Sequence, residues 1–426
     1  MISNIKTKLL SSSLFKDSFW ALSGNAIGKG LTLAAGIVVA RFLGKDLYGE
    51  YGMIKSTLLY IAVFSTFGIG FTATKYIAQY KKEHPEQIES IIKNSIIITL
   101  FLSFTLASLL FVFAKDVANF LDAPNLYRSL RLMSVAVIFN AVNSAQGGLL
   151  AGFNAFKNMA ICSCIVGGLT FIYSLIFTYF WGLEGAVLAL TLSHITSCLL
   201  YNIFVRKFLK NYSFSNYSYE NPLLKKMIKF SFPIALQEGC NSLVHWASIF
   251  LLIKMTNYGE LGLYSASSQW YAIIMFVPSV LRNVTLSHLS GSIDDKKQHK
   301  KTLYTMLGVN FIATFIPFIV VLIFSGFIVS IYGDSFYSLR SVLNVHILNS
   351  IIGCLSSIFI QEFIAQGRNW FVFICSLTRD CLIILVTYFC ISYYLSDGAL
   401  ILVSVSLVVR SLYLLTLFLK YKKENS

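Results

Sequence analysis

Ionisable side chains inside long apolar runs are the residues of this sequence whose chemistry most needs an explanation. A charged group in such a run is costly, so it usually faces a partner or a water-filled path. Basic groups there bind anions, whereas a carboxylate or an imidazole can carry a proton or a cation. The side chains concerned are Lys29, Lys55, Glu238, Arg282, Glu362, Arg379, Asp380 and Arg410.

Lys29 lies near the middle of its apolar run and belongs to a polar stripe. Asn25, Lys29, Thr32 and Gly36 follow the spacing of a single helix face. Because a lysine at that depth cannot easily extend to either end of the run, we expect Lys29 and Asn25 to line a polar, substrate-binding cavity. The alternative is a buried structural ion pair.

A second stripe follows the same rule in the other half of the chain. Glu238, Asn241, His245 and Ser248 share a helix face at i, i+3, i+7 and i+10. Glu238 and His245 are therefore candidates for coupling transport to H⁺ or Na⁺. A simple salt bridge from Glu238 to a lysine or arginine is the alternative.

Three further cations are candidates for the same cavity. Lys55 and Arg282 lie a turn or two from the ends of their runs, where each could also extend to the surface. Arg410 lies about midway along the last run. The excess of deep cations over carboxylates predicts an anionic substrate, such as a phosphate or diphosphate headgroup.

The remaining charged residues of the apolar runs are expected to have structural rather than functional roles. We expect Glu362 to be a solvated carboxylate at a helix end. Arg379 and Asp380 are adjacent in sequence, so we expect them to point in different directions from the helix and to be structural partners.

The elements that must position these groups are membrane-spanning helices. The chain is 56% hydrophobic and only 12% charged, and its mean hydropathy is +0.70, so most of it must face lipid. The apolar runs have the length of membrane helices and lack strand alternation. Twelve spans are predicted, near residues 18–40, 50–74, 91–114, 131–153, 158–181, 184–205, 228–253, 261–288, 302–330, 339–366, 369–394 and 397–419.

Orientation follows from the basic residues of the loops. With a cytoplasmic amino terminus, inside segments hold 20 Lys and Arg residues and outside loops hold 7, which predicts that both termini are cytoplasmic. The net charge of +15 lies largely beside the spans, where anionic membrane lipid attracts it, so no nucleic-acid partner is predicted.

A faint internal repeat predicts two lobes. Phe19, Arg41, Gly49 and Tyr51 return 213 positions later as Phe232, Lys254, Gly262 and Tyr264. We therefore expect an all-α polytopic membrane protein with twelve transmembrane helices in two six-helix bundles. The lobes would comprise residues 1–205 and 228–426, joined by a cytoplasmic linker at 206–227. An even number of spans per lobe implies a pseudo-twofold axis along the membrane normal.

Enzymatic function is not expected. The sequence has no Gly-Lys-Ser/Thr phosphate-binding loop, and its six histidines show no metal-ligand spacing. The outside loops are too short for a catalytic domain. No metal and no cofactor are predicted.

Several motifs resemble one family of exporters. The segments 40–44, 48–52, 67–70, 74–78 and 262–266 resemble those of the Wzx-type O-antigen flippases. That family is part of the multidrug/oligosaccharidyl-lipid/polysaccharide exporter superfamily, and the resemblance covers the whole chain. Arg41, Gly49 and Lys75 belong to these motifs, where we expect them to organise the loops.

The resemblance implies a function. An undecaprenyl-diphosphate-linked oligosaccharide would be flipped across the bacterial inner membrane by alternating access, for O-antigen or capsular polysaccharide. A polysaccharide polymerase and a chain-length regulator are the implied protein partners. Two alternatives remain: a cation-coupled multidrug antiporter of the same superfamily, and a membrane oligosaccharide polymerase or ligase.

Overall fold

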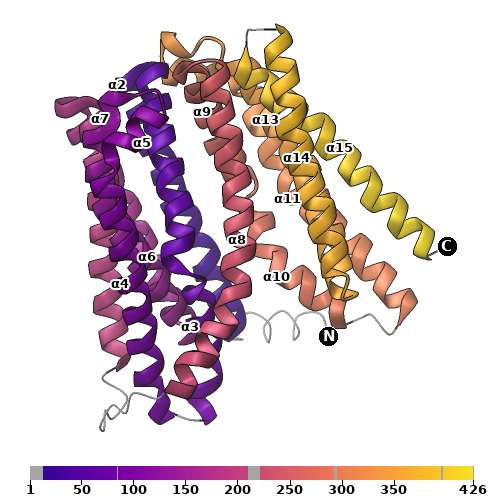
Figure 1. Ribbon diagram of the computed structural model, residues 1–426. Helices are drawn as coiled ribbons and strands as arrows, with labels where there is room; N and C mark the ends of the chain where they lie inside the picture. Colours follow the sequence, from indigo (N-terminus) through magenta and orange to yellow (C-terminus); the bar gives the residue numbers. More distant parts are fainter. Residues whose placement is uncertain (1–12, 84, 210–220, 292–294, 395–396, 426) are drawn as a thin grey trace. The chain divides into compact units, whose positions relative to one another are not determined.

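The computed structural model describes residues 13–83, 85–209, 221–291, 295–394 and 397–425, which form helices and no strands (Figure 1). The first half contains α2 (Ser13–Thr66), α3 (Ile69–Glu83), η1 (Pro85–Gln87), α4 (Ile88–Val112), α5 (Ala114–Phe120), η2 (Pro124–Leu126), α6 (Tyr127–Gly152) and α7 (Phe156–Leu209). The second half contains α8 (Asn221–Met255), α9 (Tyr258–Ile274), α10 (Phe276–Gly291), α11 (Lys296–Ile323), α12 (Ser325–Tyr332), η3 (Asp334–Phe336), α13 (Leu339–Ala365), α14 (Asn369–Tyr394) and α15 (Gly398–Asn425). The predicted all-helical class is confirmed.

The helices are those of a multi-pass membrane protein. Among the described residues, eight helices are long and apolar enough to cross a membrane, namely α2, α4, α6, α7, α11, α13, α14 and α15. Each of the twelve segments predicted from sequence falls on helix, with breaks of only one or two residues. The helix count itself differs from twelve. Some helices hold more than one predicted segment, as α7 does, whereas the predicted segments 50–74, 91–114, 261–288 and 302–330 each extend over two helices.

Glycines break the two longest helices. Both α2 and α7 have 54 residues, which as one straight helix would extend about 80 Å, far beyond the roughly 30 Å of a bilayer core. Gly44 in α2 (φ 70°, ψ 172°) and Gly182 in α7 (φ 53°, ψ −129°) leave the helical region. In α7 the Thr170 hydroxyl donates to the Ser193 oxygen at 2.9 Å, so the chain folds back at Gly182.

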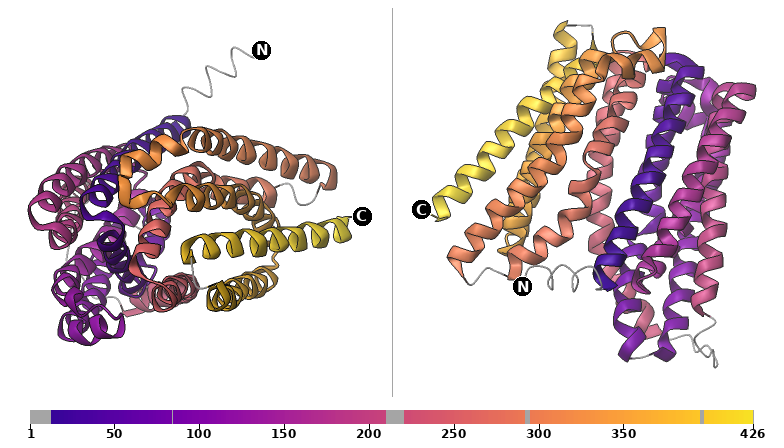
Figure 2. Two further views of the ribbon diagram at one scale, coloured as in Figure 1. Left: turned by 90° about the horizontal axis from the view of Figure 1, so that it is seen from above. Right: turned by 180° about the vertical axis from the view of Figure 1, so that it is seen from behind.

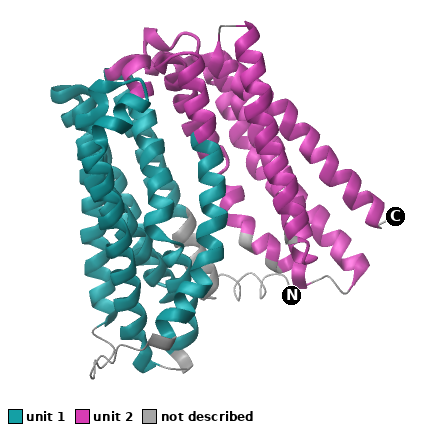
Figure 3. Cartoon of the chain, viewed as in Figure 1, with its two compact units in different colours: residues 1–42, 51–246 teal, residues 43–50, 247–426 magenta. Residues whose placement is uncertain are grey.

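The chain forms two compact units (Figure 3). Unit 1 comprises residues 1–42 and 51–246, and unit 2 comprises residues 43–50 and 247–426. Each unit therefore includes a piece from the other half of the sequence. The turn at 43–50 packs in unit 2, whereas most of α8 packs in unit 1.

Small residues let the helices of unit 1 approach closely around α6, which packs against α3, α4 and α7 (Figure 2). A Cβ atom at Gly148 would lie 2.1 Å from the Gly70 carbonyl oxygen of α3, so the two backbones touch there. The Thr74 hydroxyl donates to the Gly148 carbonyl at 3.0 Å. Such small-residue contacts are typical of helices packed in membranes, where burial of apolar surface does not drive association.

Unit 2 is organised around α13, which packs against α9, α10, α11 and α15. Its core includes Leu303, Phe359, Phe363 and Leu417, contributed by α11, α13 and α15. The central position of α13 determines which polar groups are buried in this unit.

Glu362 on α13 is one of these buried groups, so the expectation of a solvated helix-end carboxylate is wrong. Its side chain is fully buried. One carboxylate oxygen lies 2.7 Å from His299 Nε2 of α11 and accepts a hydrogen bond from Gln366 at 2.7 Å. A position near the end of α13 is not exposed, because the ends of α11 and α15 cover it.

The two copies of the repeated turn contact each other within unit 2. A Cβ atom at Gly49 would lie 1.7 Å from the Tyr258 carbonyl oxygen and 3.0 Å from the backbone nitrogen of Gly262. Gly49 and Gly262 are the equivalent glycines of the two repeats. Nearby, Gln269 donates to the buried Tyr48 hydroxyl. Beside this turn, the buried Tyr332 hydroxyl accepts a hydrogen bond from Trp270 at 3.1 Å.

Candidate functional site

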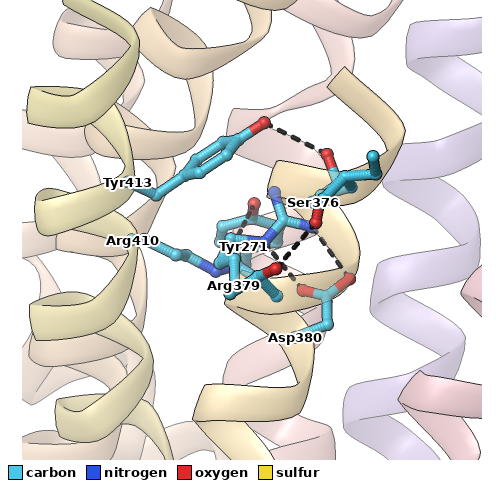
Figure 4. Close-up of polar contacts among 8 residues, drawn as sticks. Tyr271, Ser376, Arg379, Asp380, Arg410 and Tyr413 are labelled. Carbon is cyan, nitrogen blue, oxygen red and sulfur yellow. Dashed lines mark hydrogen bonds and ion pairs between the residues drawn. The ribbon is translucent and has the colours of Figure 1, made fainter. Parts of the chain in front are cut away.

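Arg410 of α15 is the centre of a polar cluster inside unit 2 (Figure 4). Its Nη1 donates to the Tyr271 hydroxyl of α9 at 3.1 Å, and the guanidinium carbon lies 5.9 Å from the Tyr271 ring centroid. Gly353 of α13 leaves room for this contact, since a Cβ atom there would lie 3.1 Å from the Tyr271 hydroxyl oxygen. Among the described residues, Arg410 Nε is buried and has no hydrogen-bond partner.

Tyr271 connects Arg410 to a stacked histidine. The His346 ring of α13 lies between those of Tyr264 and Tyr271, with centroid distances of 5.3 Å and 5.0 Å. His346 Nδ1 lies 2.8 Å from the Ser267 hydroxyl oxygen. The orientation of the Arg410 side chain is therefore supported by a tyrosine that is itself held by aromatic packing on α9 and α13.

Arg379 and Asp380 of α14 lie beside this cluster and pair with each other (Figure 4). Arg379 donates to both carboxylate oxygens of Asp380, at 2.7 Å and 2.9 Å. The expectation that they point in different directions is wrong. The Arg379 guanidinium also lies 4.8 Å from the Tyr413 ring centroid, and the Tyr413 hydroxyl lies 3.1 Å from Ser376 Oγ.

The basic groups of this cluster are chemically suited to an anion. The charge of Arg379 is balanced by a direct ion pair with its neighbouring carboxylate. Arg410 donates to a neutral hydroxyl and interacts with Asp380 only at longer range. A guanidinium in an apolar bundle with an unused N–H is suited to a phosphate or carboxylate oxygen. Sequence inspection found Arg410 but missed Tyr271 and His346, because an aromatic or histidine in an apolar run has no distinctive spacing.

In unit 1, the two residues of the first polar stripe have different surroundings: Asn25 packs against α7, whereas Lys29 is exposed. The Asn25 side-chain oxygen accepts a hydrogen bond from Ser163 of α7 at 3.0 Å. Gly28 packs directly on the Ser163 backbone, where a Cβ atom would lie 2.5 Å from its carbonyl oxygen. Lys29, the next residue, is exposed. Asn25 thus helps to fix α2 against α7, while Lys29 extends from that contact.

Lys55 lies in the interior of unit 1, on the second arm of α2. It is half-buried and within electrostatic reach of His194 on α7. The His194 backbone carbonyl accepts a hydrogen bond from Asn143 of α6 at 3.0 Å. Lys55 of α2 and His194 of α7 therefore lie near each other, a proximity that sequence spacing alone did not reveal.

The second polar stripe, which begins with Glu238 on α8, is exposed in unit 1. Glu238, Asn241 and His245 are all exposed, and Trp246 anchors the same helix by donating from its indole nitrogen to the Thr57 hydroxyl oxygen at 3.3 Å. In unit 2, Arg282 of α10 is also exposed. These side chains are accessible from outside the unit to which each belongs.

The two basic residues of the sequence motifs lie at exposed positions of unit 1. Lys75 on α3 extends over the Phe230 ring of α8, with its nitrogen 3.9 Å from the ring centroid. Arg41 is exposed near the break in α2. The Lys75 contact links α3 to α8 across the first unit.

The fold is shared with a solved transporter structure. A solved structure described as the inward-facing conformation of a multidrug resistance MATE family transporter matches with a TM-score of 0.79, covering 93% of this chain and 94% of that chain at 14% identity. At that identity the match shows a shared fold.

Family membership follows from the sequence. The model of the polysaccharide biosynthesis protein family matches residues 14–286, and the chain belongs to that family. It is 22% identical to a "putative O-antigen transporter" of Shigella flexneri over 95% of this chain and 98% of the relative. A segment covering 34% of each chain is 28% identical to the EPS I polysaccharide export inner membrane protein EpsE of Ralstonia solanacearum. The predicted resemblance to Wzx-type flippases is confirmed.

Proposed function

We propose that this protein flips an undecaprenyl-diphosphate-linked oligosaccharide repeat unit from the cytoplasmic to the periplasmic leaflet, for O-antigen or capsular polysaccharide. Similarity to an O-antigen transporter over 95% of the chain is the observation that carries the proposal. Arg410 supports it, because a guanidinium with an unused N–H inside an apolar bundle suits a diphosphate.

The proposed architecture has twelve crossings. The broken helices α2 and α7 each supply two, with α3 extending the second arm of α2, and α4 and α6 complete six for the first lobe. In the second lobe, α8, α9 with α10, α11 with α12, α13, α14 and α15 supply six more. The two lobes, 1–205 and 228–426, would rock about a pseudo-twofold axis, giving the headgroup access to each side in turn while the lipid tail stays in the bilayer.

The proposed location is the inner membrane of a bacterium, with both termini in the cytoplasm. The excess of 20 inside over 7 outside basic loop residues supports this orientation. A polymerase and a chain-length regulator would act on the repeat units after they are flipped. The protein itself would break no covalent bond.

Charge reversal tests the substrate-binding role of Lys29. In a strain that depends on this gene for surface polysaccharide, Lys29→Glu should abolish the polysaccharide while an epitope-tagged protein remains at normal levels in the membrane. Lys225→Glu is the matched control, because Lys225 is also exposed in unit 1 but lies outside the predicted spans. Normal polysaccharide with Lys29→Glu would remove this residue from the site.

Ion coupling through Glu238 needs a separate test. Glu238→Gln removes the titrating group but keeps the shape of the side chain, so coupled transport should no longer respond to an imposed proton or sodium gradient. If the variant keeps full transport at every gradient, Glu238 is not the coupling group.

Two measurements discriminate the alternatives. A deletion strain should accumulate single lipid-linked repeat units on the cytoplasmic face, whereas accumulation on the outer face would indicate a polymerase. Resistance to cationic drugs on expression of the gene would indicate a multidrug antiporter. The cationic excess among the deep charges favours the lipid-linked sugar over a cationic drug.

A further inference from the structure

A largely apolar groove of about 680 Å³ lies in unit 2 between α11 and α15, with α13 as its floor. Tyr304 and Phe311 line it from α11, and Ser411 and Phe418 line it from α15. Phe359 of α13 is buried beneath it. α13 packs against both α11 and α15, the helices that form the two walls (Figure 2).

A glycine keeps the groove open. Gly308 lines the α11 wall, and a Cβ atom there would meet nothing within 4 Å. The aromatic rims are exposed, with 55% of Tyr304 and 42% of Phe418 accessible. The groove is thus an open apolar trough, whose volume is within the roughly 300–1,000 Å³ that holds one ligand of moderate size.

Both walls of the groove continue into lysines. On α11, Lys297, Lys300, Tyr304, Gly308 and Phe311 follow i, i+3, i+7, i+11 and i+14, so they share one helix face. Lys297 and Lys300 are exposed, and so is Lys422 on the α15 wall.

On the α15 wall the groove residues come first in the sequence and the lysine follows them. Ser411, Leu415, Phe418 and Lys422 follow i, i+4, i+7 and i+11. The beginning of α11 and the end of α15 meet at the same end of the groove, since Tyr421 lies within electrostatic reach of Tyr304. One end of an apolar trough is therefore flanked by three cations.

We propose that this groove binds an anionic glycerophospholipid of the bilayer, with one acyl chain in the trough and the phosphate headgroup at Lys297, Lys300 and Lys422. An apolar channel ending in basic residues fits an amphiphile with an anionic head. The volume fits a single acyl chain rather than a long polyprenyl tail, which favours a bilayer lipid over the transported substrate. The proposal does not rest on the proposed function, because the residues that line the groove do not include Arg410, Tyr271, Arg379 or Asp380.

Lipid titration of the purified full-length protein, followed by native mass spectrometry, tests the proposal. The probes are phosphatidylglycerol and phosphatidylcholine with identical acyl chains, and undecaprenyl phosphate as a third ligand. K297Q/K300Q/K422Q removes the three cations, and G308F fills the trough. K225Q/K226Q/K229Q, three exposed lysines of α8, is the matched control for total charge.

The wild type should bind phosphatidylglycerol more tightly than phosphatidylcholine. The lysine variant should lose roughly 10- to 100-fold in phosphatidylglycerol binding and keep its phosphatidylcholine binding, G308F should weaken both, and the α8 control should behave as wild type. Phosphatidylglycerol binding unchanged in K297Q/K300Q/K422Q, or reduced equally in the control, overturns the site. Tight undecaprenyl phosphate binding without phosphatidylglycerol binding overturns the assignment of the occupant.

Discussion

Replacing Gly49 with alanine should destabilise the protein, because the backbone of the repeated turn leaves no room for a methyl group. The added Cβ atom would lie 1.7 Å from the Tyr258 carbonyl oxygen and 2.6 Å from its carbon. Both are backbone atoms, so no side-chain rotation relieves the overlap. The turn and the start of α9 would have to separate by roughly 2 Å to restore ordinary van der Waals contact.

The expected magnitude follows from that geometry. Overpacking by one methyl group in a close-packed interior costs about 1–3 kcal/mol. Against this, alanine in a helix interior is favoured over glycine by roughly 0.5–1 kcal/mol, so the net effect remains destabilising. Gly168→Ala is the matched control. A Cβ atom at Gly168, within α7, meets nothing within 4 Å, so this variant should be neutral or slightly more stable.

The measurement is the thermal unfolding midpoint of the purified proteins in one detergent, followed by tryptophan fluorescence and by loss of the monodisperse peak. Gly49→Ala should melt several degrees below wild type and Gly168→Ala at or above it. Equal midpoints for the two variants, or a lower midpoint for Gly168→Ala, would refute the close approach of the two turns.

Three further outcomes follow from the contacts. Glu362→Ala removes the hydrogen-bond partner of the buried His299 ring and should lower stability by about 1–3 kcal/mol, read as a thermal shift; a midpoint equal to that of wild type would contradict its burial. In a double-mutant cycle, Thr170→Val and Ser193→Ala should couple by about 0.6 kcal/mol, and by at most about 1.7 kcal/mol, whereas strict additivity would argue against the hairpin in α7. Tyr271→Phe removes the hydroxyl that accepts a hydrogen bond from Arg410 and should reduce surface polysaccharide at an unchanged protein level. A normal amount of surface polysaccharide in this variant would show that the hydrogen bond is not needed.

Much of the fold could be predicted because membrane helices are specified locally. A run of about 20 apolar residues satisfies its own backbone hydrogen bonds and needs no distant partner to become helical. The twelve predicted segments therefore fall on helix. The breaks at Gly44 and Gly182 fall in the predicted gaps at 41–49 and 182–183, but which residue carries the break shows only in the backbone conformation.

The candidate site could be predicted only in part. Depth along a run identified Arg410, and helical periodicity identified the stripes of Asn25 with Lys29 and of Glu238 with His245. Neither criterion reports which helices are neighbours, so Tyr271 was missed beside Arg410. The same limit explains the error at Glu362, because proximity to a helix end says nothing about what covers that end.

The sequence by itself determined the class of protein, since composition and apolar runs require a membrane environment and the motifs identify the family. It also determined the repeat that relates Gly49 to Gly262. Only the tertiary structure decided that these two glycines touch, that Arg379 pairs with the adjacent Asp380, and that Arg410 has an unused N–H. The physical reason is that helix formation depends on neighbours along the chain, whereas the partner of a polar side chain depends on which helices pack together.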